Sequence, residues 1–141
     1  MKVSLIVAAL VVPMVVMAGE FPAGSPRFAS SLSAATKAAS VSGKPVVVVF
    51  SASWCPPCQT MKNEVYPSAA VKAFHDRFEW AYLDVDDESN AAAAEKLGVD
   101  GIPHIQFLST TGKDLGQQVG SSSAEEFAKR LEKVLKKSGS R

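Results

Sequence analysis

The sequence predicts an α/β fold in which helices flank one mixed β-sheet. The chain has 141 residues, of which 47% are hydrophobic and 21% charged, enough apolar material for a single buried core. Segments with helical periodicity alternate along it with short apolar segments. One of these, VVVVF at residues 46–50, is rich in β-branched residues and suits a strand that is covered on both faces.

The first eighteen residues differ from the rest and are interpreted as a signal peptide. Lys2 precedes an almost unbroken apolar run over 3–16, and the sequence VMA at 16–18 has the small or aliphatic residues that a signal peptidase recognises. We expect cleavage after Ala18 and a periplasmic or other extracytoplasmic location. The alternative is an uncleaved membrane anchor, which is disfavoured because the run is shorter than about 20 residues and contains Pro13.

The expected mature chain is electrically balanced. Loss of Lys2 from the fifteen Lys and Arg residues leaves fourteen basic residues against fourteen acidic ones. This balance gives no indication of nucleic-acid binding. An acidic cluster at 84–88 and the basic residues at 129–141 are attributed to the solvated faces of a loop and a terminal helix. We expect a monomer without a cofactor.

An irregular lead-in and one helix precede the buried strand. Residues 19–27 (GEFPAGSPR) are rich in Gly and Pro, which predicts an irregular segment. Apolar residues recur at helical spacing from Phe28 to Ala39 and predict an amphipathic helix over roughly 28–41, which Gly43 helps to end. The strand at 46–50 then follows.

The chain after this strand continues the alternation. The helical pattern returns over 59–65, and Pro67 bends or ends it before a second helical piece that turns Val71 and Phe74 inward. The segment EWAYLDVD at 79–86 predicts the next strand.

Another helix and two strands are expected next. Ser89 is expected to cap a helix over 91–97, and Gly98 to close it in a left-handed conformation. Apolar residues at 105–108 mark a third strand, and a Gly-containing turn reverses the chain into a fourth strand at 115–119.

The last helix has a clear start. Ser123 and Glu126 have the spacing of a capping box. The expected inner face of this helix consists of Phe127, Leu131, Val134 and Leu135. The expected domain runs from 28 to 137, and residues 138–141 form a short tail.

The two cysteines of the chain, Cys55 and Cys58, lie in the segment SWCPPCQTMK at 53–62. From the residues alone they could be a redox pair, half of a metal site or an inert staple. At the first turn of a helix, Cys55 would face free backbone N–H groups and the positive end of the helix dipole, which favour the thiolate. One turn further on, Cys58 could resolve a mixed disulfide at Cys55, and we expect it to be more buried and less nucleophilic.

The two prolines between the cysteines restrict the site. Pro56 and Pro57 fix two φ angles and remove two N–H groups. The backbone donors left near the Cys55 sulfur are then chiefly those of Cys58 and Gln59. The prolines are therefore candidates for tuning the redox pair.

The motifs FSASWCPPC at 50–58 and GIPH at 101–104, together with the order of the expected elements, resemble the thioredoxin family over roughly 28–137. The segment WCPPCQTMKNEVYPSAAV is most similar to secreted thioredoxin-like proteins related to the C-terminal domain of the disulfide reductase DsbD. The resemblance implies a thioredoxin-like fold with a central four-stranded mixed β-sheet flanked by helices.

The resemblance also implies roles for residues around the cysteines. Pro103 would be cis and would place an extended backbone edge beside Cys55, where a substrate peptide can pair with it. Trp54 and Ile102 would contact the substrate as well. His104 could touch the substrate or tune Cys55, and an ordinary histidine at the start of a strand is an equal alternative.

The chain departs from the family at two positions. Val49 stands where other thioredoxins bury an Asp, and Tyr82 replaces the Lys that commonly accompanies it. Proton transfer to and from Cys58 would then use water, Glu64 or another group.

The resemblance implies an exported thiol–disulfide oxidoreductase that reduces protein disulfides. Its substrates would be exported proteins with disulfides, and a membrane reductase of the DsbD type would supply electrons. Two alternatives remain open. One is a soft-metal module in which Cys55, Cys58 and His104 bind Cu(I). The other is a binding or chaperone-like module with slow turnover.

Overall fold

The computed structural model describes residues 21–139. The expected signal peptide at 1–18 and the first two residues of the lead-in lie outside the described residues. Residues 21–27 contain neither helix nor strand. Within the described part of the chain, no helix combines the length and the apolar character needed to cross a bilayer.

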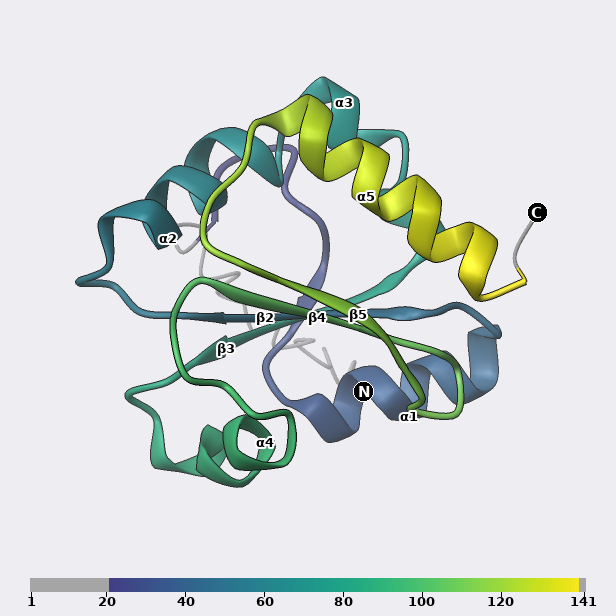
Figure 1. Ribbon diagram of the computed structural model, residues 1–141, viewed down its shortest axis with the longest axis horizontal. Helices are drawn as coiled ribbons and strands as arrows, with labels where there is room; N and C mark the ends of the chain where they lie inside the picture. Colours follow the sequence, from purple (N-terminus) through teal and green to yellow (C-terminus); the bar gives the residue numbers. More distant parts are fainter. Residues whose placement is uncertain (1–20, 140–141) are drawn as a thin grey trace, which may run out of the picture.

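The centre of the fold is a five-stranded mixed sheet in the order β1-β3-β2-β4-β5 (Figure 1). Its strands are β1 Phe28–Ala29, β2 Val46–Ser51, β3 Glu79–Asp84, β4 His104–Leu108 and β5 Asp114–Val119. Strands β1, β3 and β2 are parallel, whereas β4 and β5 run antiparallel to their neighbours. The α/β class is confirmed, and the sheet has one more strand than expected because the short β1 pairs with β3.

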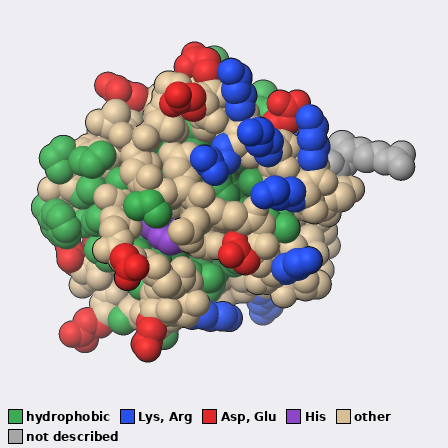
Figure 2. All heavy atoms as spheres, in the orientation of Figure 1, with side chains coloured by type: hydrophobic (Ala, Val, Ile, Leu, Met, Phe, Trp, Pro, Cys, Tyr) green, Lys and Arg blue, Asp and Glu red, His purple; other side chains and the backbone are tan. Residues whose placement is uncertain are grey.

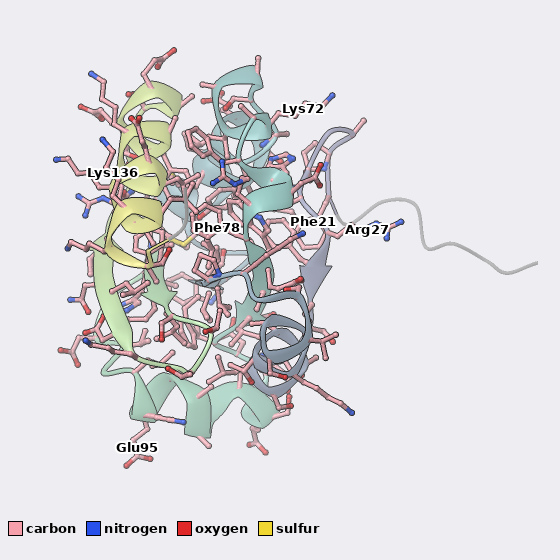
Figure 3. The ribbon with its side chains drawn as sticks, turned by 90° about the vertical axis from the view of Figure 1, so that its right-hand side faces the viewer. Phe21, Arg27, Lys72, Phe78, Glu95 and Lys136 are labelled. Atoms are coloured by element: carbon pink, nitrogen blue, oxygen red, sulfur yellow. A yellow bond between two sulfur atoms is a disulfide. The ribbon has the colours of Figure 1, made fainter. Side chains whose placement is uncertain are left out.

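Helices cover both faces of this sheet. They are α1 Leu32–Ser42, α2 Pro56–Thr60, α3 Ala69–Lys72, α4 Ala91–Lys96 and α5 Ala124–Lys137, with a π-helical turn at Met61–Val65 and 3-10 turns at His75–Arg77 and Glu88–Asn90. In Figure 1, α2, α3 and α5 lie on one face, and α1 and α4 on the other. Figure 3 shows the same division, with Lys136 on α5 and Glu95 on α4 at opposite sides of the sheet.

The expected helix at 28–41 is wrong at its start. The helix begins at Leu32, because the Ser31 side chain accepts a hydrogen bond from the Ala34 N–H and caps it. Phe28 instead belongs to β1, and its ring lies 5.3 Å from that of Tyr82. The helical spacing of Phe28 was coincidental, since its packing is set by the aromatic residues of the neighbouring strand.

The helical pattern expected from Gln59 begins earlier in the structure, because Pro56 and Pro57 suit the first positions of a helix, whose N–H groups lack partners there. This start agrees with the expected place of Cys55 at the first turn of a helix. Ser89 is not a cap. The Asp87 side chain accepts from the Ser89 N–H and opens the 3-10 turn that leads into α4. Gly98 has φ +66°, which confirms the expected left-handed conformation.

The core lies on both sides of β2, all of whose residues are buried. Val47 and Val49 pack in the cluster that includes residues from α5, and Val46, Val48 and Phe50 pack in the cluster beside α1. The expected inner face of α5 is confirmed as buried, and both hydrogen bonds of the capping box at Ser123 are present. The buried central strand thus holds the connection from β2 to α2 in place.

Candidate active site

The cysteine pair lies at the start of α2, which follows β2 at one end of the sheet (Figure 1). Cys55 is the N-cap residue of α2, and Pro56 and Pro57 occupy its first two helical positions. Cys55 and Cys58 form a disulfide, with their Cα atoms 5.2 Å apart. The first and fourth residues of the motif therefore meet across one helical turn.

The two cysteines are buried to different degrees. Cys55 is 4% exposed and Cys58 is 1% exposed, so Cys58 is the more buried of the two, as expected for a resolving cysteine. Both side chains are largely covered in the disulfide form. Trp54 is 65% exposed beside them. Its Nε1–H donates to Asp86 Oδ2 at 2.7 Å, which fixes the position of the indole at the surface.

The prolines leave fewer donors near the Cys55 sulfur than the sequence indicated. The Gln59 N–H donates to the Cys55 carbonyl oxygen at 3.1 Å, so this donor serves the helix backbone. The expectation that it would help to stabilise the sulfur is therefore wrong. The Cys58 N–H is the remaining donor of the pair that the sequence indicated.

Pro103 lies beside the disulfide. The Ile102–Pro103 peptide bond is cis, as expected. The Cys55 Sγ lies 3.8 Å from the Ile102 carbonyl oxygen, and Ile102 packs against the small cluster formed by Ala52 and the two cysteines. The structure thus brings Cys55, Ile102 and Pro103 together from segments that are 47 residues apart.

Apolar side chains gather at the surface of this end of the molecule (Figure 2). Trp54 and Val119 are among the most exposed large hydrophobic residues of the described chain. Val119 ends β5, and the next residue, Gly120, donates its N–H to the Pro103 carbonyl oxygen at 2.9 Å. The cysteine pair therefore has an apolar surface around it.

His104 is buried and belongs to a hydrogen-bonded chain. Its Nε2 lies 2.8 Å from Gln106 Oε1, and Gln106 Nε2 donates to Asp114 Oδ1 at 2.7 Å. Its Nδ1 has no hydrogen-bond partner among the described residues. The ring stands edge-on to Phe50, with centroids 5.9 Å apart, on the face of the sheet that carries α1. These contacts support the interpretation of His104 as a strand-start residue.

The structure does not support the metal-binding alternative. Within residues 21–139, no three His, Cys, Asp or Glu side chains lie close enough together to hold a metal ion. His104 is therefore not brought to the cysteine pair as a third ligand.

Sequence analysis missed a hydroxyl pair next to the site. Ser51 Oγ and Tyr82 OH lie 2.6 Å apart. Val49 is paired with Tyr82 in the parallel register of β2 and β3, so the two departures from the family pattern are neighbours. The signal in the sequence was the alternation of β2, which turns Ser51 to the same face as Val49. Glu64 is exposed.

A cavity of about 340 Å³ opens beside this hydroxyl pair. Its lining includes Ser51, Ala52, Gln59, Lys62, Tyr82 and Asp84. Phe21 from the lead-in also lines it, and its ring lies 5.0 Å from that of Tyr82. The Lys62 ammonium lies 5.0 Å from the centre of the Phe21 ring. Figure 3 shows Phe21 turned toward the body of the molecule.

Comparisons with curated proteins find thioredoxin-like relatives. The chain is 35% identical over 85 residues to the chloroplastic thioredoxin-like protein HCF164 of Oryza sativa, which covers 60% of this chain and 32% of that protein. It is 27% identical over 137 residues to the thiol:disulfide interchange protein TxlA of Synechococcus elongatus, covering 95% of this chain and 71% of TxlA. The chain thus spans about a third of HCF164.

Solved structures agree with the fold. A thioredoxin from Thermus thermophilus matches with a TM-score of 0.73 and 30% identity over 82% of this chain and 91% of its own. The oxidised C-terminal domain of DsbD from Neisseria meningitidis matches with a TM-score of 0.63 and 22% identity over 75% of this chain and 97% of its own, a likeness of fold alone. The family model described as a thioredoxin-like domain matches residues 32–135. The chain therefore belongs to the thioredoxin-like domain family.

Proposed function

We propose that the chain is a thiol–disulfide oxidoreductase that reduces protein disulfides through Cys55 and Cys58. The observation that carries this proposal is the disulfide between them at the start of α2, with the Cys55 sulfur 3.8 Å from the Ile102 carbonyl oxygen. Relatives named thiol:disulfide interchange proteins support the same chemistry.

The proposed reaction has two exchange steps. In the reduced protein, the Cys55 thiolate attacks a substrate disulfide, forms a mixed disulfide and releases one substrate thiolate. The Cys58 thiolate then attacks the Cys55 sulfur, which releases the second substrate thiolate and closes the Cys55–Cys58 disulfide. Two electrons pass from the protein to the substrate, and each released thiolate takes up a proton.

The position of Cys55 supports its role as the attacking thiol. It is the less buried cysteine and precedes a helical segment that continues from Pro56 to Val65. The Cys58 N–H and the positive end of the helix dipole at such a start stabilise a thiolate. Trp54, Ile102 and Pro103 would hold the substrate peptide against this sulfur through the exposed indole and the backbone edge at the cis bond.

We further propose that the protein acts after export as a domain over 28–137. The apolar leader at 1–18 supports this location. Exported proteins with disulfides would be the substrates, and a membrane reductase of the DsbD type would return electrons to the pair. The relative named DsbD, from Colwellia psychrerythraea, is 28% identical over 105 residues and supports this donor class.

The redox equilibrium of the Cys55/Cys58 pair with glutathione tests the direction of electron flow. A reductase should have a pair that is more reducing than glutathione, so that its disulfide persists in excess reduced glutathione. A pair that glutathione reduces readily would contradict the reductase and favour an oxidase.

Cysteine variants test the two roles. Cys55→Ser should abolish reduction of a protein disulfide such as that of insulin, because no attacking thiol remains. Cys58→Ser should still attack and should accumulate mixed disulfides, since nothing resolves them. Non-reducing electrophoresis and intact mass measure these adducts. Equal alkylation rates at the two thiols, without adducts in Cys58→Ser, would contradict the assignment of Cys55.

A further inference from the structure

Cys58 needs a route for its proton if it resolves a mixed disulfide, as the proposed function requires. The thiolate is the attacking species, so the Cys58 thiol must lose a proton before it reacts. Cys58 is 1% exposed and packs in a cluster with Ala52 and Cys55, against which Val85 and Ile102 also pack. Apolar packing disfavours a charged sulfur and provides no proton acceptor.

Two residues that line the cavity beside Ser51 and Tyr82 also adjoin Cys58. Ala52 belongs to the same packed cluster as Cys58 and also lines the cavity. Gln59, the residue after Cys58, lines it too, and its Nε2 donates to the Ala52 carbonyl oxygen at 3.0 Å. Ala52, which packs in one cluster with Cys58, and Gln59, which follows Cys58 on the helix, thus link the buried thiol to the cavity.

The cavity has room for water. Its volume is about 340 Å³, and one water occupies about 30 Å³ in the liquid. Polar side chains line it, including Ser51, Lys62, Tyr82 and Asp84. A cavity with several polar partners suits ordered water, whereas a dry cavity is lined by apolar groups.

Two hydroxyl groups in this lining can pass a proton. Ser51 is 1% exposed, and its Oγ lies 2.6 Å from Tyr82 OH. Each hydroxyl both donates and accepts a hydrogen bond, so a proton received at one oxygen can be matched by a proton released from the other. Ser51 directly precedes Ala52, and both residues line the cavity.

We propose that the cavity lined by Ser51 and Tyr82, the Ser51–Tyr82 cavity, carries the proton of Cys58 to and from solvent. During resolution, one proton leaves the Cys58 sulfur for cavity water and the Ser51–Tyr82 pair, and one proton leaves the pair for solvent. When the disulfide is reduced again, one proton returns along the same route. The charged groups that line this cavity are Lys62, Asp84 and Asp87.

Rapid-quench kinetics on the reduced full-length protein tests this role. The substrate is a linear disulfide of two different peptides: attack by Cys55 releases the first peptide thiol, and attack by Cys58 releases the second. Ser51→Ala and Tyr82→Phe should each slow the second release about tenfold or more, in the range of assisted proton transfer, and leave the first release unchanged.

Tyr66→Phe is the matched control. Tyr66 is a buried tyrosine whose OH has no hydrogen-bond partner among the described residues, and it does not line this cavity. It should release both peptides at the parental rates. Tyr82→Phe keeps the ring that packs on Phe28, so this variant remains a test even where Ser51→Ala misfolds.

The outcomes separate this role from the proposed function. A second release at the parental rate in Tyr82→Phe would overturn the proton route while leaving the reductase intact. Equal slowing of both releases, or the same slowing in Tyr66→Phe, would also overturn it, because either result indicates general damage to the site. A parent protein that releases neither peptide would instead overturn the proposed function.

Discussion

His104 is fixed by hydrogen bonds that connect a buried strand with the surface. Gln106 Nε2 donates to Asp114 Oδ1 at 2.7 Å, so the side-chain amide oxygen of Gln106, Oε1, must face His104. His104 therefore donates from Nε2 to this oxygen at 2.8 Å, and its neutral form carries its proton there. Because Gln106 is buried, its Oε1 depends on His104 for a partner.

Replacement of His104 should lower stability rather than change the redox chemistry. His104→Phe keeps a ring against Phe50 but leaves Gln106 Oε1 without a donor, which should lower the free energy of unfolding by about 1–3 kcal/mol. Adding Gln106→Leu should recover part of this loss, because both partners are then apolar. Urea denaturation of the two single variants and the double variant measures the coupling. The alkylation rate of Cys55 should stay unchanged in His104→Phe. A changed rate would instead indicate that His104 tunes the reactivity of Cys55.

The residues of the site differ in how far the sequence could predict them. Cys55 and Cys58 are neighbours in one motif, and Pro103 belongs to a second short motif at 101–104, so local patterns identified them. The hydroxyl pair joins Ser51 to Tyr82 across 31 residues. Their contact depends on the register between β2 and β3, which a single sequence does not reveal.

Strand β2 supports the site from the centre of the sheet. It lies between β3 and β4, and Val48 faces Ala81 on one side and Gln106 on the other in the sheet register. Val48 is fully buried. Any group placed at this position must fit within an apolar interior.

Val48→Asp should prevent folding, because an unpaired carboxylate in this interior costs more than the several kcal/mol by which a domain is stable. The matched control is Val41→Asp, since Val41 is 86% exposed at the end of α1. Thermal unfolding followed by circular dichroism distinguishes the two. Soluble Val48→Asp protein that unfolds cooperatively would show that β2 is not the central strand.

The capping box at the start of α5 should contribute to the stability of the fold. Ser123 Oγ accepts from the Glu126 N–H at 3.2 Å, and Glu126 Oε2 accepts from the Ser123 N–H at 3.0 Å. Ser123→Ala should lower the free energy of unfolding by about 1 kcal/mol. The control Ser121→Ala, at an exposed position before the helix, should have no effect. Equal losses in chemical denaturation would contradict the role of the cap.

Elements with strong local patterns were predicted well, and those set by neighbouring strands were not. The capping box and apolar face of α5 are local features, and the sequence predicted both. The two-residue β1 exists through its pairing with Trp80 and Ala81 on β3, which the sequence near Phe28 does not indicate. The π-helical turn at Met61–Val65 likewise has no pattern that distinguishes it from the expected helix.

At the scale of the whole molecule, Phe21 of the lead-in packs against the domain at 28–137. The Phe21 ring lies 4.7 Å from that of Phe28 and 5.0 Å from that of Tyr82. The lead-in thus covers an aromatic cluster and forms one wall of the Ser51–Tyr82 cavity. Phe21→Ala should lower the free energy of unfolding by about 1–2 kcal/mol. Urea denaturation beside the exposed control Val41→Ala measures this, and equal stability would show that the lead-in does not support the domain.

This contact limits where an export signal can be removed. Phe21 would be the third residue of a chain cleaved after Ala18, and a cut beyond Phe21 would remove the ring that packs on Tyr82. Cleavage after Ala18 would keep the ring, so we expect the exported protein to begin at Gly19. Intact-mass measurement of protein recovered from the extracytoplasmic fraction determines its first residue. A mass that includes residues 1–18 would contradict cleavage, and a start beyond Phe21 would mean that the mature domain folds without this ring.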